Sequence, residues 1–557
     1  MTCIKEARCL RAVAADARAL PRHTGRMDEA AETPASAPAD APAPAPAPAS
    51  APGATLAHNL RSELTRATGA PVSLLETHIS WILLAGTHAY KLKKPVRMPF
   101  ADFSTVASRK HFCDEELRLN RRLAPSLYLS VLPVRGSVEA PRLAGAGEPI
   151  DHLVCMRRFD DGALMSERLA AGQLEDADLA LLGHRLADFH RDAPQAAADS
   201  AFGQPHRVLA AVRKVLAQLG PAWGREVVAP LRHWVASEAW ALRRLWRRRR
   251  AEGAVRECHG DLHLANVAMT PEGPTAFDCI EFDPGLRWID VFSDLAFVTM
   301  DLHARGRPDL AAVFLDAYLQ SSGDFGGLRA LRFHEVYRAL VRALVAVLQP
   351  ASGAPDYAAC ARRLAERRPP PRLLITHGLS GSGKSSAAAR LMAASGAIRL
   401  RSDVERKRLF GLAALERSHP RGVDIYTAEA TQRTFARLRE GARTTLEAGY
   451  PVIVDAAFLR RAERESFRAL AAEAGAGFAI LHCHAPDAEL RRRLRRREAA
   501  GDDPSEADSA VLDRQLDWQE PLDDAELRQT IALDTAQPFD AQALDSRWRS
   551  MSMPDAD

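Results

Sequence analysis

One short segment constrains this chain more than any other, the glycine-rich run from Gly378 to Ser385. It reads GLSGSGKS, follows the apolar stretch Leu373–Thr376 and precedes a stretch that favours a helix. This is the GxxxxGK[ST] pattern in the strand-then-helix context that the motif requires. Glycines let backbone N–H groups close around phosphate oxygens, and the positive end of the helix adds to the attraction. The segment therefore predicts a P-loop that binds ATP.

The expected nucleotide-binding residues of this loop are consecutive: Gly378, Leu379, Ser380, Gly381, Ser382, Gly383, Lys384, Ser385 and Ser386. We expect Lys384 to reach the β- and γ-phosphates and Ser385 to ligate Mg²⁺. A further metal ligand is expected at Asp455, because Val452–Asp455 is an apolar strand that ends in a carboxylate. The alternative is that Asp455 caps the helix that follows.

Beyond residue 371 the sequence alternates between short apolar strands and helical stretches. The expected strands are Leu373–Thr376, Ile398–Arg401, Val452–Asp455, Phe478–His482 and Thr530–Leu533. Such alternation implies a parallel sheet with helices on both faces. We therefore expect the C-terminal fold to be α/β, a doubly wound parallel sheet of the P-loop NTPase type.

A carboxylate and an arginine follow the second expected strand in the segment Arg401-Ser-Asp403-Val-Glu-Arg406. Asp403 would lie across from the γ-phosphate and act as a general base toward an acceptor hydroxyl. Arg406 would face the same cleft and hold an acidic acceptor. The alternative is a capped helix with a solvated Asp–Arg pair. Together with Lys384, these two are the expected catalytic residues of this half.

The stretch Leu490–Arg497 supplies six arginines on one expected helix. Some of them would close over the phosphates as a lid and stabilise charge in the transition state. For most of them a solvated basic face is the alternative. With these elements, the region from Gly378 to about Leu522 resembles small P-loop kinases of the gluconate kinase, zeta-toxin and polynucleotide 5′-kinase type. The resemblance implies a phosphotransferase and does not name the acceptor.

A second candidate site lies upstream, in the strand–loop–strand region that begins at Val255. His259, Asp261 and Asn266 have the spacing HxDxxxxN, and Asp278 follows at the end of another apolar segment. This spacing is typical of protein-kinase-like catalytic loops. There the first Asp accepts the proton of the acceptor hydroxyl, and the Asn and the later Asp hold Mg²⁺. The alternative is a polar hairpin with His259 as a core histidine.

Two further carboxylates, Asp290 and Asp294, would either support this loop by accepting its backbone N–H groups or cap a helix. A kinase-like site also needs a lysine on an early strand and a glutamate on the next helix. We expect Lys91 on the strand His88–Lys93, which follows a strand at His78–Leu84 and a turn at Gly86.

Lys93 shares a face of that strand with Lys91, because side chains alternate along a strand. The helix Ser108–Leu123 offers Glu115 and Glu116, of which Glu116 is preferred. Val154–Phe159 would be either the hinge that contacts adenine or simply a core strand. No GxGxxG motif precedes these residues; only Gly86 lies between the first two strands.

These residues resemble aminoglycoside-phosphotransferase-like kinases. The whole order resembles a bacterial family in which such a domain is fused to a P-loop kinase domain. Tyr90-Lys-Leu-Lys-Lys-Pro95, the helix around Asn120 and the element at Ser402 are placed as in that family. The resemblance runs from about Thr55 to Leu522 and implies a protein-kinase-like, α+β fold for the N-terminal part. It implies kinase chemistry without a substrate.

We expect five segments along the chain: a disordered Ala/Pro-rich segment (1–54), the kinase-like domain (55–350), a proline-rich linker (351–371), the P-loop domain (372–540) and a tail (541–557). Met27 is an alternative start to Met1. The eight cysteines form no CxxC pair and no apolar run is long enough to span a membrane, which favours a cytoplasmic protein.

The net charge of +4 gives the chain no strong pull toward nucleic acid or membrane. An arginine run, Arg243–Arg250, lies upstream of the catalytic loop. A solvated helix end is its ordinary explanation, and nucleic-acid contact is an alternative that is not favoured.

We therefore predict an enzyme with two ATP–Mg²⁺ sites that phosphorylates hydroxyl acceptors, small molecules or polynucleotides. One alternative is a single active P-loop kinase with a degenerate kinase-like domain. The other is an ATP-dependent nucleic-acid-binding switch.

Overall fold

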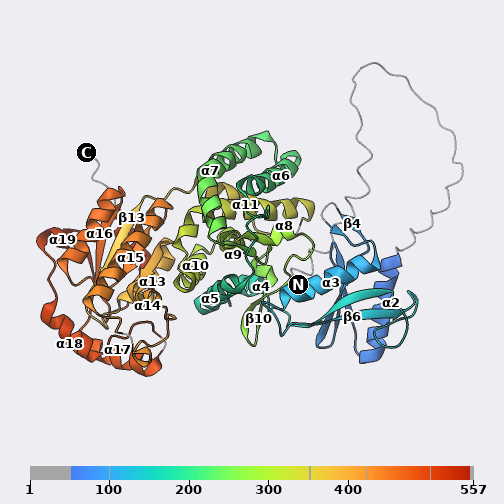
Figure 1. The fold of residues 1–557 in the computed structure, drawn as a ribbon, viewed down its shortest axis with the longest axis horizontal. Helices are drawn as coiled ribbons and strands as arrows, with labels where there is room; N and C mark the ends of the chain where they lie inside the picture. The colour runs from blue at the N-terminus through green and yellow to red at the C-terminus, as the bar shows by residue number, and fades with distance from the viewer. Residues whose placement is uncertain (1–51, 99–100, 351–352, 423, 502, 552–557) are drawn as a thin grey trace, which may run out of the picture. The chain divides into compact units, whose positions relative to one another are not determined.

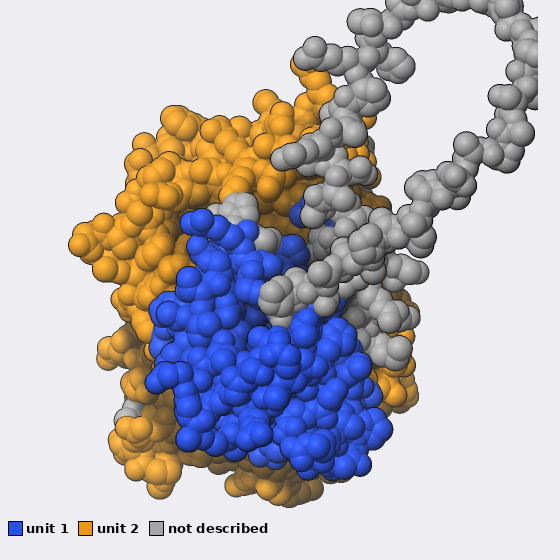
Figure 2. Space-filling view, turned by 90° about the vertical axis from the view of Figure 1, so that its right-hand side faces the viewer, with its two compact units in different colours: residues 1–161, 348–352 blue, residues 162–347, 353–557 orange. Residues whose placement is uncertain are grey.

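The computed structural model describes residues 52–98, 101–350, 353–422, 424–501 and 503–551. The chain divides into two compact units, coloured separately in Figure 2. Unit 1 comprises residues 1–161 and 348–352, and unit 2 comprises residues 162–347 and 353–557. The predicted disordered segment lies outside the described residues except for its last three, which begin helix α2 (Pro52–Thr68).

Unit 1 is built on an antiparallel sheet with the strand order β1-β2-β3-β8-β6-β7. The strands are β1 (Ser73–Glu76), β2 (Ser80–Ala85), β3 (His88–Lys93), β6 (Tyr128–Gly136), β7 (Pro141–Arg142) and β8 (Asp151–Arg157). Helix α3 (Val106–Asn120) contacts β8 and β6. Helix α2 and the sheet share an apolar core whose members include Leu56, Leu60, Trp81, Leu83 and Leu153.

The strand predicted at His78–Leu84 begins later than expected. A turn precedes β2, because the Oγ1 of Thr77 accepts the backbone N–H of Ser80 at 2.9 Å. The residues before this turn form a strand of their own, β1, which the sequence did not indicate. Helix α3 matches its prediction, and its N-cap Thr105 accepts the backbone N–H of Ser108.

The first part of unit 2 is mostly helical (Figure 1). Its helices are α4 (Met165–Ala170), α5 (Asp176–Asp192), α6 (Pro205–Trp223), α7 (Arg225–Ala251), α8 (Pro284–Arg287), α9 (Val291–Ala304), α10 (Pro308–Ser322), α11 (Leu328–Leu348) and α12 (Tyr357–Glu366), with the 3₁₀ turns η2 (Leu264–Asn266) and η3 (Phe325–Gly327). Short strands β9 (Val255–Glu257) and β12 (Trp288–Asp290) pair with each other, and β10 (Val267–Thr270) pairs with β11 (Gly273–Ala276).

The second part of unit 2 is a five-stranded parallel sheet with the order β14-β15-β13-β16-β17. Its strands are β13 (Arg372–His377), β14 (Ile398–Arg401), β15 (Val452–Asp455), β16 (Gly477–His484) and β17 (Thr530–Asp534). All five predicted strands are present. The helices between and after them are α13 (Lys384–Ser395), α14 (Ser402–Leu409), α15 (Ala428–Glu447), α16 (Arg461–Glu473), α17 (Asp487–Ala500), α18 (Ser509–Trp518), α19 (Asp524–Arg528) and α20 (Ala541–Met551).

The predicted C-terminal tail is wrong for residues 541–551, which form helix α20. Leu544 and Trp548 of this helix are buried in the same core as Leu374 of β13 and Leu391 of α13. The Arg372 guanidinium lies 4.2 Å from the centre of the Trp548 ring. A short amphipathic helix at a chain end is stabilised by such burial, which its sequence alone does not reveal.

The compact units divide the chain after Asp161 and not within the predicted linker 351–371. The reason is packing, since Ala312 and Val313 of α10 lie against the apolar core of the parallel sheet. The domain boundaries drawn from the sequence therefore stay a prediction.

The predicted fold class is confirmed. The antiparallel sheet with helix α3, followed by a mostly helical region that bears the HxDxxxxN loop, has the element order of a protein-kinase-like fold. The parallel sheet is a doubly wound P-loop fold. Among the described helices, none combines the length and apolar character that crossing a membrane requires.

Candidate functional site: a P-loop cavity and a kinase-like loop

The P-loop connects β13 to α13 in a conformation that only glycine fits. Gly378 has φ 138, and a Cβ there would lie 2.3 Å from the carbonyl oxygen of Cys483. At Gly381, with φ 81, a Cβ would lie 2.7 Å from the carbonyl oxygen of Leu490. Both the left-handed backbone and the close approach exclude a side chain. The loop is thus shaped as phosphate binding requires.

Lys384 begins α13 and turns its amine back into the loop. Its Nζ donates to the carbonyl oxygen of Leu379 at 2.8 Å and lies 3.5 Å from the Ser382 Oγ. Burial lowers the pKa of Lys384, against the opposing effect of Asp455. An ammonium held among backbone groups in this way is suited to an anionic ligand.

Ser385 and Asp455, the two expected metal ligands of this half, lie side by side. The Ser385 Oγ donates to the Asp455 Oδ1 at 3.2 Å. The Asp455 Oδ2 is buried and has no hydrogen-bond partner among the described residues; the Arg401 Nε is 3.7 Å away. A hydroxyl and a carboxylate with an unsatisfied oxygen are ligands that Mg²⁺ prefers. These two residues therefore fit the expected metal.

Asp403 and Arg406 line one cavity of about 900 Å³ together with Lys384, Ser385 and Asp455. Burial raises the pKa of Asp403, and nearby Asp455 adds to this, although Arg401 and Arg406 act in the opposite direction. A carboxylate with a raised pKa is a better proton acceptor than an ordinary one.

Arg406 is held on the wall of this cavity. Its Nη1 donates to the carbonyl oxygen of Ile425 at 2.9 Å and to the Thr431 Oγ1 at 3.1 Å. Its guanidinium lies 5.1 Å from the centre of the Tyr426 ring, and its buried Nε has no partner among the described residues. A fixed cation with a donor to spare is suited to an acidic group.

Several cavity residues were missed by sequence reasoning: Tyr426, Phe435, Phe458, Arg460, Glu463 and Trp518. Arg460 lies over the ring of Trp518 at 5.1 Å, and burial raises the pKa of Glu463. These residues come from four separate stretches of the chain, so no local pattern marks them.

The arginines of α17 divide into two groups. Arg491 and Arg492 pair with acidic residues and do not line the cavity. Arg493, Arg496 and Arg497 line it, and the Arg493 Nη1 lies 3.3 Å from the carbonyl oxygen of Gly381. Three of the six arginines thus line the P-loop cavity, whereas Arg495, like Arg491 and Arg492, does not. That the three act as a lid stays a prediction.

In the kinase-like part of unit 2, the predicted loop residues come together. The Asn266 Nδ2 donates to the carbonyl oxygen of Asp261 at 2.9 Å. The β10–β11 hairpin pairs Val267 with Ala276, so Asn266 and Asp278 flank the same end of it. Asp278 has φ 66, a left-handed backbone that non-glycine residues rarely adopt and that is common at functional sites.

The pKa of Asp261 lies below its usual value. Burial by itself would raise this pKa, but His263, with Arg342 and His259, lowers it. Asp294 accepts the backbone N–H groups of His259 at 3.0 Å and Gly260 at 2.8 Å, the supporting role considered for it. Asp290 instead caps α9.

In unit 1, Lys91 and Lys93 share Glu116 as their partner. The two Nζ atoms lie 2.7 Å from the Glu116 Oε1 and Oε2 respectively. Burial would raise the pKa of Glu116, but the two lysines lower it to about 2. The preferred Lys–Glu pair therefore exists. Glu115 pairs with Arg118 on the exposed side of α3.

The arginine run before the catalytic loop is partly structural. Arg249 is buried and pairs with Asp290 and Asp324. Arg250 donates to three backbone carbonyls. Arg243 and Arg247 line a groove of about 570 Å³ between α6 and α7. This division weakens the nucleic-acid alternative, because only part of the run is available for phosphates.

Two mycobacterial proteins resemble the chain over most of its length. They are uncharacterized protein Rv2004c of Mycobacterium tuberculosis and uncharacterized protein Mb2027c of Mycobacterium bovis. Each is 30% identical over 460 residues, which cover 80% of this chain and 91% of the relative. This chain belongs to their family. In this chain, residues 373–522 match the family AAA_33, which is described as an AAA domain.

Two solved structures each resemble part of this chain. A gluconokinase from Sinorhizobium meliloti is 26% identical and covers 33% of this chain and 90% of its own, with a TM-score of 0.23. A choline/ethanolamine kinase family protein from Mesorhizobium loti is 16% identical and covers 56% and 92%, with a TM-score of 0.34. The AAA_33 match at residues 373–522 and the backbone of the P-loop support nucleotide binding by the C-terminal domain.

Proposed function

We propose that the P-loop domain transfers the γ-phosphoryl group of ATP to a hydroxyl of a small acceptor that carries an acidic group. The observation that carries this proposal is that Asp403 and Arg406 line the same cavity as Lys384, Ser385 and Asp455. A base, a fixed cation and a phosphate-binding loop in one cavity are the parts that phosphoryl transfer needs.

The chain's own residues divide the work of this transfer. The P-loop and Lys384 bind and orient the phosphates, and Ser385 and Asp455 would hold Mg²⁺, which neutralises charge on the phosphates. Asp403 takes the proton of the acceptor hydroxyl as its oxygen bonds to the γ-phosphorus, while the bond from that phosphorus to the bridging oxygen breaks and ADP leaves. Arg493, Arg496 and Arg497 stabilise the charge that is spread over the transferred group.

One part of the cavity wall, which we call the acceptor wall, is formed by Arg406, Tyr426, Phe458, Arg460 and Trp518. Its chemistry supports a small anionic acceptor with an apolar part. Arg406 and Arg460 offer cations, and Tyr426, Phe458 and Trp518 offer aromatic faces. Aromatic rings beside guanidinium groups bind ligands that combine acidic and apolar surfaces. A polynucleotide 5′-hydroxyl is a less supported acceptor that the same assay tests.

We further propose a second ATP site in the kinase-like part of unit 2. Asp261 would be its base, and Asn266 and Asp278 would hold Mg²⁺. The Lys91–Glu116 pair of unit 1 stays a predicted phosphate-binding pair. The loop contacts of Asn266 and the left-handed backbone of Asp278 support this assignment. The main alternative remains a degenerate kinase-like domain beside one active P-loop kinase.

The test is a screen of full-length protein with γ-labelled ATP against pools of hydroxy acids, neutral sugars and a 5′-hydroxyl oligonucleotide. We expect label to be transferred to a hydroxy acid by the wild type and not by Lys384→Ala. Transfer only to the oligonucleotide would reject the small-acceptor proposal. Absence of transfer to every pool would reject the kinase assignment of the P-loop domain.

A further inference from the structure

Helix α10 of the kinase-like part lies directly against the P-loop domain within unit 2 (Figure 1). One face packs closely on α5, where a Cβ at Gly183 would lie only 2.6 Å from the carbonyl oxygen of Phe314. The other face places Ala312 and Val313 against the core of the parallel sheet. The helix is therefore buried on both sides and has little freedom to shift.

A buried ion pair joins this helix to strand β14. The Asp316 carboxylate accepts from the Arg399 Nη2 at 2.7 Å and from its Nε at 3.3 Å. Gln320, one turn further on, donates to the Asp316 Oδ1 at 3.2 Å and to the carbonyl oxygen of Arg399 at 2.9 Å. Both charged side chains are 9% exposed, so water screens this pair little.

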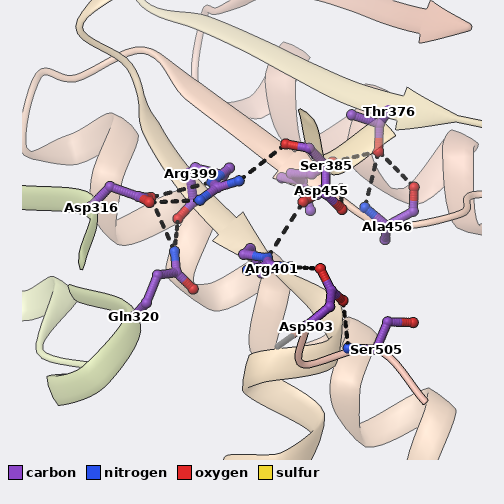
Figure 3. A network of polar contacts seen from close by, with 11 residues as sticks. Asp316, Gln320, Thr376, Ser385, Arg399, Arg401, Asp455, Ala456, Asp503 and Ser505 are labelled. Atoms are coloured by element: carbon purple, nitrogen blue, oxygen red, sulfur yellow. Dashed lines mark hydrogen bonds and ion pairs between the residues drawn. The ribbon is translucent and has the colours of Figure 1, made fainter. Parts of the chain in front are cut away.

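The Nη1 side of the Arg399 guanidinium contacts the first turn of helix α13, which follows the P-loop. The Arg399 Nη1 donates to the carbonyl oxygen of Ser385 at 3.2 Å, and the Ser385 Oγ donates to the Asp455 Oδ1. Figure 3 shows this line of contacts from Asp316 through Arg399 to the two residues that fit Mg²⁺. The guanidinium is planar and rigid, so fixing one edge on Asp316 fixes the direction of the other.

A neighbouring arginine on the same strand completes the arrangement. Arg401 lies two residues beyond Arg399, hence on the same face of β14. Its Nε is 3.7 Å from the Asp455 Oδ2, and its Nη2 is 3.5 Å from the Asp503 Oδ2. Asp455 is thus contacted from one side by Ser385, whose carbonyl oxygen accepts from Arg399, and from the other by Arg401.

We infer that Arg399, oriented by Asp316 of α10, is a positioning residue for the Ser385–Asp455 metal site, and that the kinase-like part thereby completes the P-loop site. This inference rests on the proposed function, because it assumes that the P-loop binds nucleotide with Mg²⁺. Residues that orient metal ligands change metal affinity when they are altered, although they do not touch the metal.

The test measures ADP binding to full-length protein by calorimetry, once with Mg²⁺ and once with a chelator. We expect Asp316→Asn and Arg399→Met to weaken binding with Mg²⁺ by about tenfold or more. Binding without Mg²⁺ should change far less. Asp316→Glu, which keeps the charge, should retain most of the Mg²⁺-dependent affinity. Asp309→Asn, on the same helix but paired with Arg307, should bind as the wild type does.

An equal loss with and without Mg²⁺, or no loss in either variant, would overturn the inference. Thermal unfolding of each variant identifies any that fail to fold. If Arg399→Met fails to fold, the comparison is between the two Asp316 variants. Asp316→Glu must then bind ADP with Mg²⁺ more tightly than Asp316→Asn does. The proposed function fails separately, when wild-type protein transfers no phosphoryl group although it binds ADP with Mg²⁺ in a Lys384-dependent way.

Discussion

At the scale of single residues, the carboxylates expected to act as bases in the two candidate sites differ in their pKa shifts. The pKa of Asp403 is raised by burial and by Asp455, whereas the loop carboxylate Asp261 of the kinase-like part has a lowered pKa beside His263. The Asp403 carboxylate therefore takes up a proton more readily than the Asp261 carboxylate. This difference favours Asp403 as the stronger base of the two.

We expect Asp403→Asn to lower kcat for phosphoryl transfer by about 10²–10⁴-fold, because the amide cannot take the acceptor proton. The KM for ATP should change little, since Lys384 and the loop bind the phosphates. The wild-type rate should fall as the pH drops through the raised pKa of Asp403. Steady-state kinetics against pH measure both effects. Glu440→Gln, exposed on α15, is the control, and an equal loss there would contradict the assignment.

A second prediction concerns the stability of unit 1. Glu116→Gln leaves Lys91 and Lys93 buried without a counter-charge, so the free energy of unfolding should fall by about 3–5 kcal/mol. The neighbouring Glu115→Gln removes an exposed pair and should cost less than about 1 kcal/mol. Denaturant titrations compare the two, and equal losses would show that the buried pair is not stabilising.

The same carboxylate predicts a pH dependence. The pKa of Glu116 is lowered from 4.5 to about 2 in the folded chain. Its contribution is therefore fully present above pH 4.5 and is lost as the pH falls toward 2. Between these values the wild type should lose stability more steeply than Glu116→Gln in urea titrations. Parallel curves would contradict this.

At the scale of elements, the strands that carry the sites follow from local patterns, and the terminal helix does not. Val452–Asp455 has apolar residues and a carboxylate at its end, and it forms β15 as predicted. Helix α20 is short, and its sequence contains several polar residues. It forms because Trp548 and Leu544 enter a core made by distant strands.

We expect Trp548→Ala to lower the free energy of unfolding by about 3–5 kcal/mol, because it removes a fully buried side chain and leaves a cavity. Trp240→Ala is the matched control, since Trp240 is 69% exposed. Denaturation followed by circular dichroism measures both. A small effect at Trp548 would mean that α20 is not part of the folded core.

At the scale of the whole molecule, helix α10 contacts the supports of both candidate sites in unit 2. The Tyr318 hydroxyl lies 3.1 Å from the His190 Nδ1, and the His190 Nε2 lies 3.2 Å from the Asp294 Oδ2. Asp294 in turn holds the catalytic loop, while Asp316 of the same helix holds Arg399. One helix thus supports two loops that are far apart in the sequence.

If both sites are active, single substitutions should separate them. We expect Lys384→Ala to abolish transfer at the P-loop site and leave the second activity, and Asp261→Ala to do the reverse. Lys91→Ala should follow Asp261→Ala. Labelled-ATP assays on the acceptors found in the screen measure each activity. If Asp261→Ala leaves every transfer intact, the kinase-like part is not a second enzyme.

The P-loop, the strands around it, the kinase-like loop and the preferred Lys–Glu pair all follow from the amino-acid sequence. These features depend on spacing within short segments, where residue type and period decide the local structure. The residues of the acceptor wall, the burial of α20 and the contact of Asp316 with Arg399 could be seen only in the folded chain. Those depend on which distant surfaces pack together. Asp316 and Arg399 are 83 positions apart in the sequence, and no local pattern pairs them.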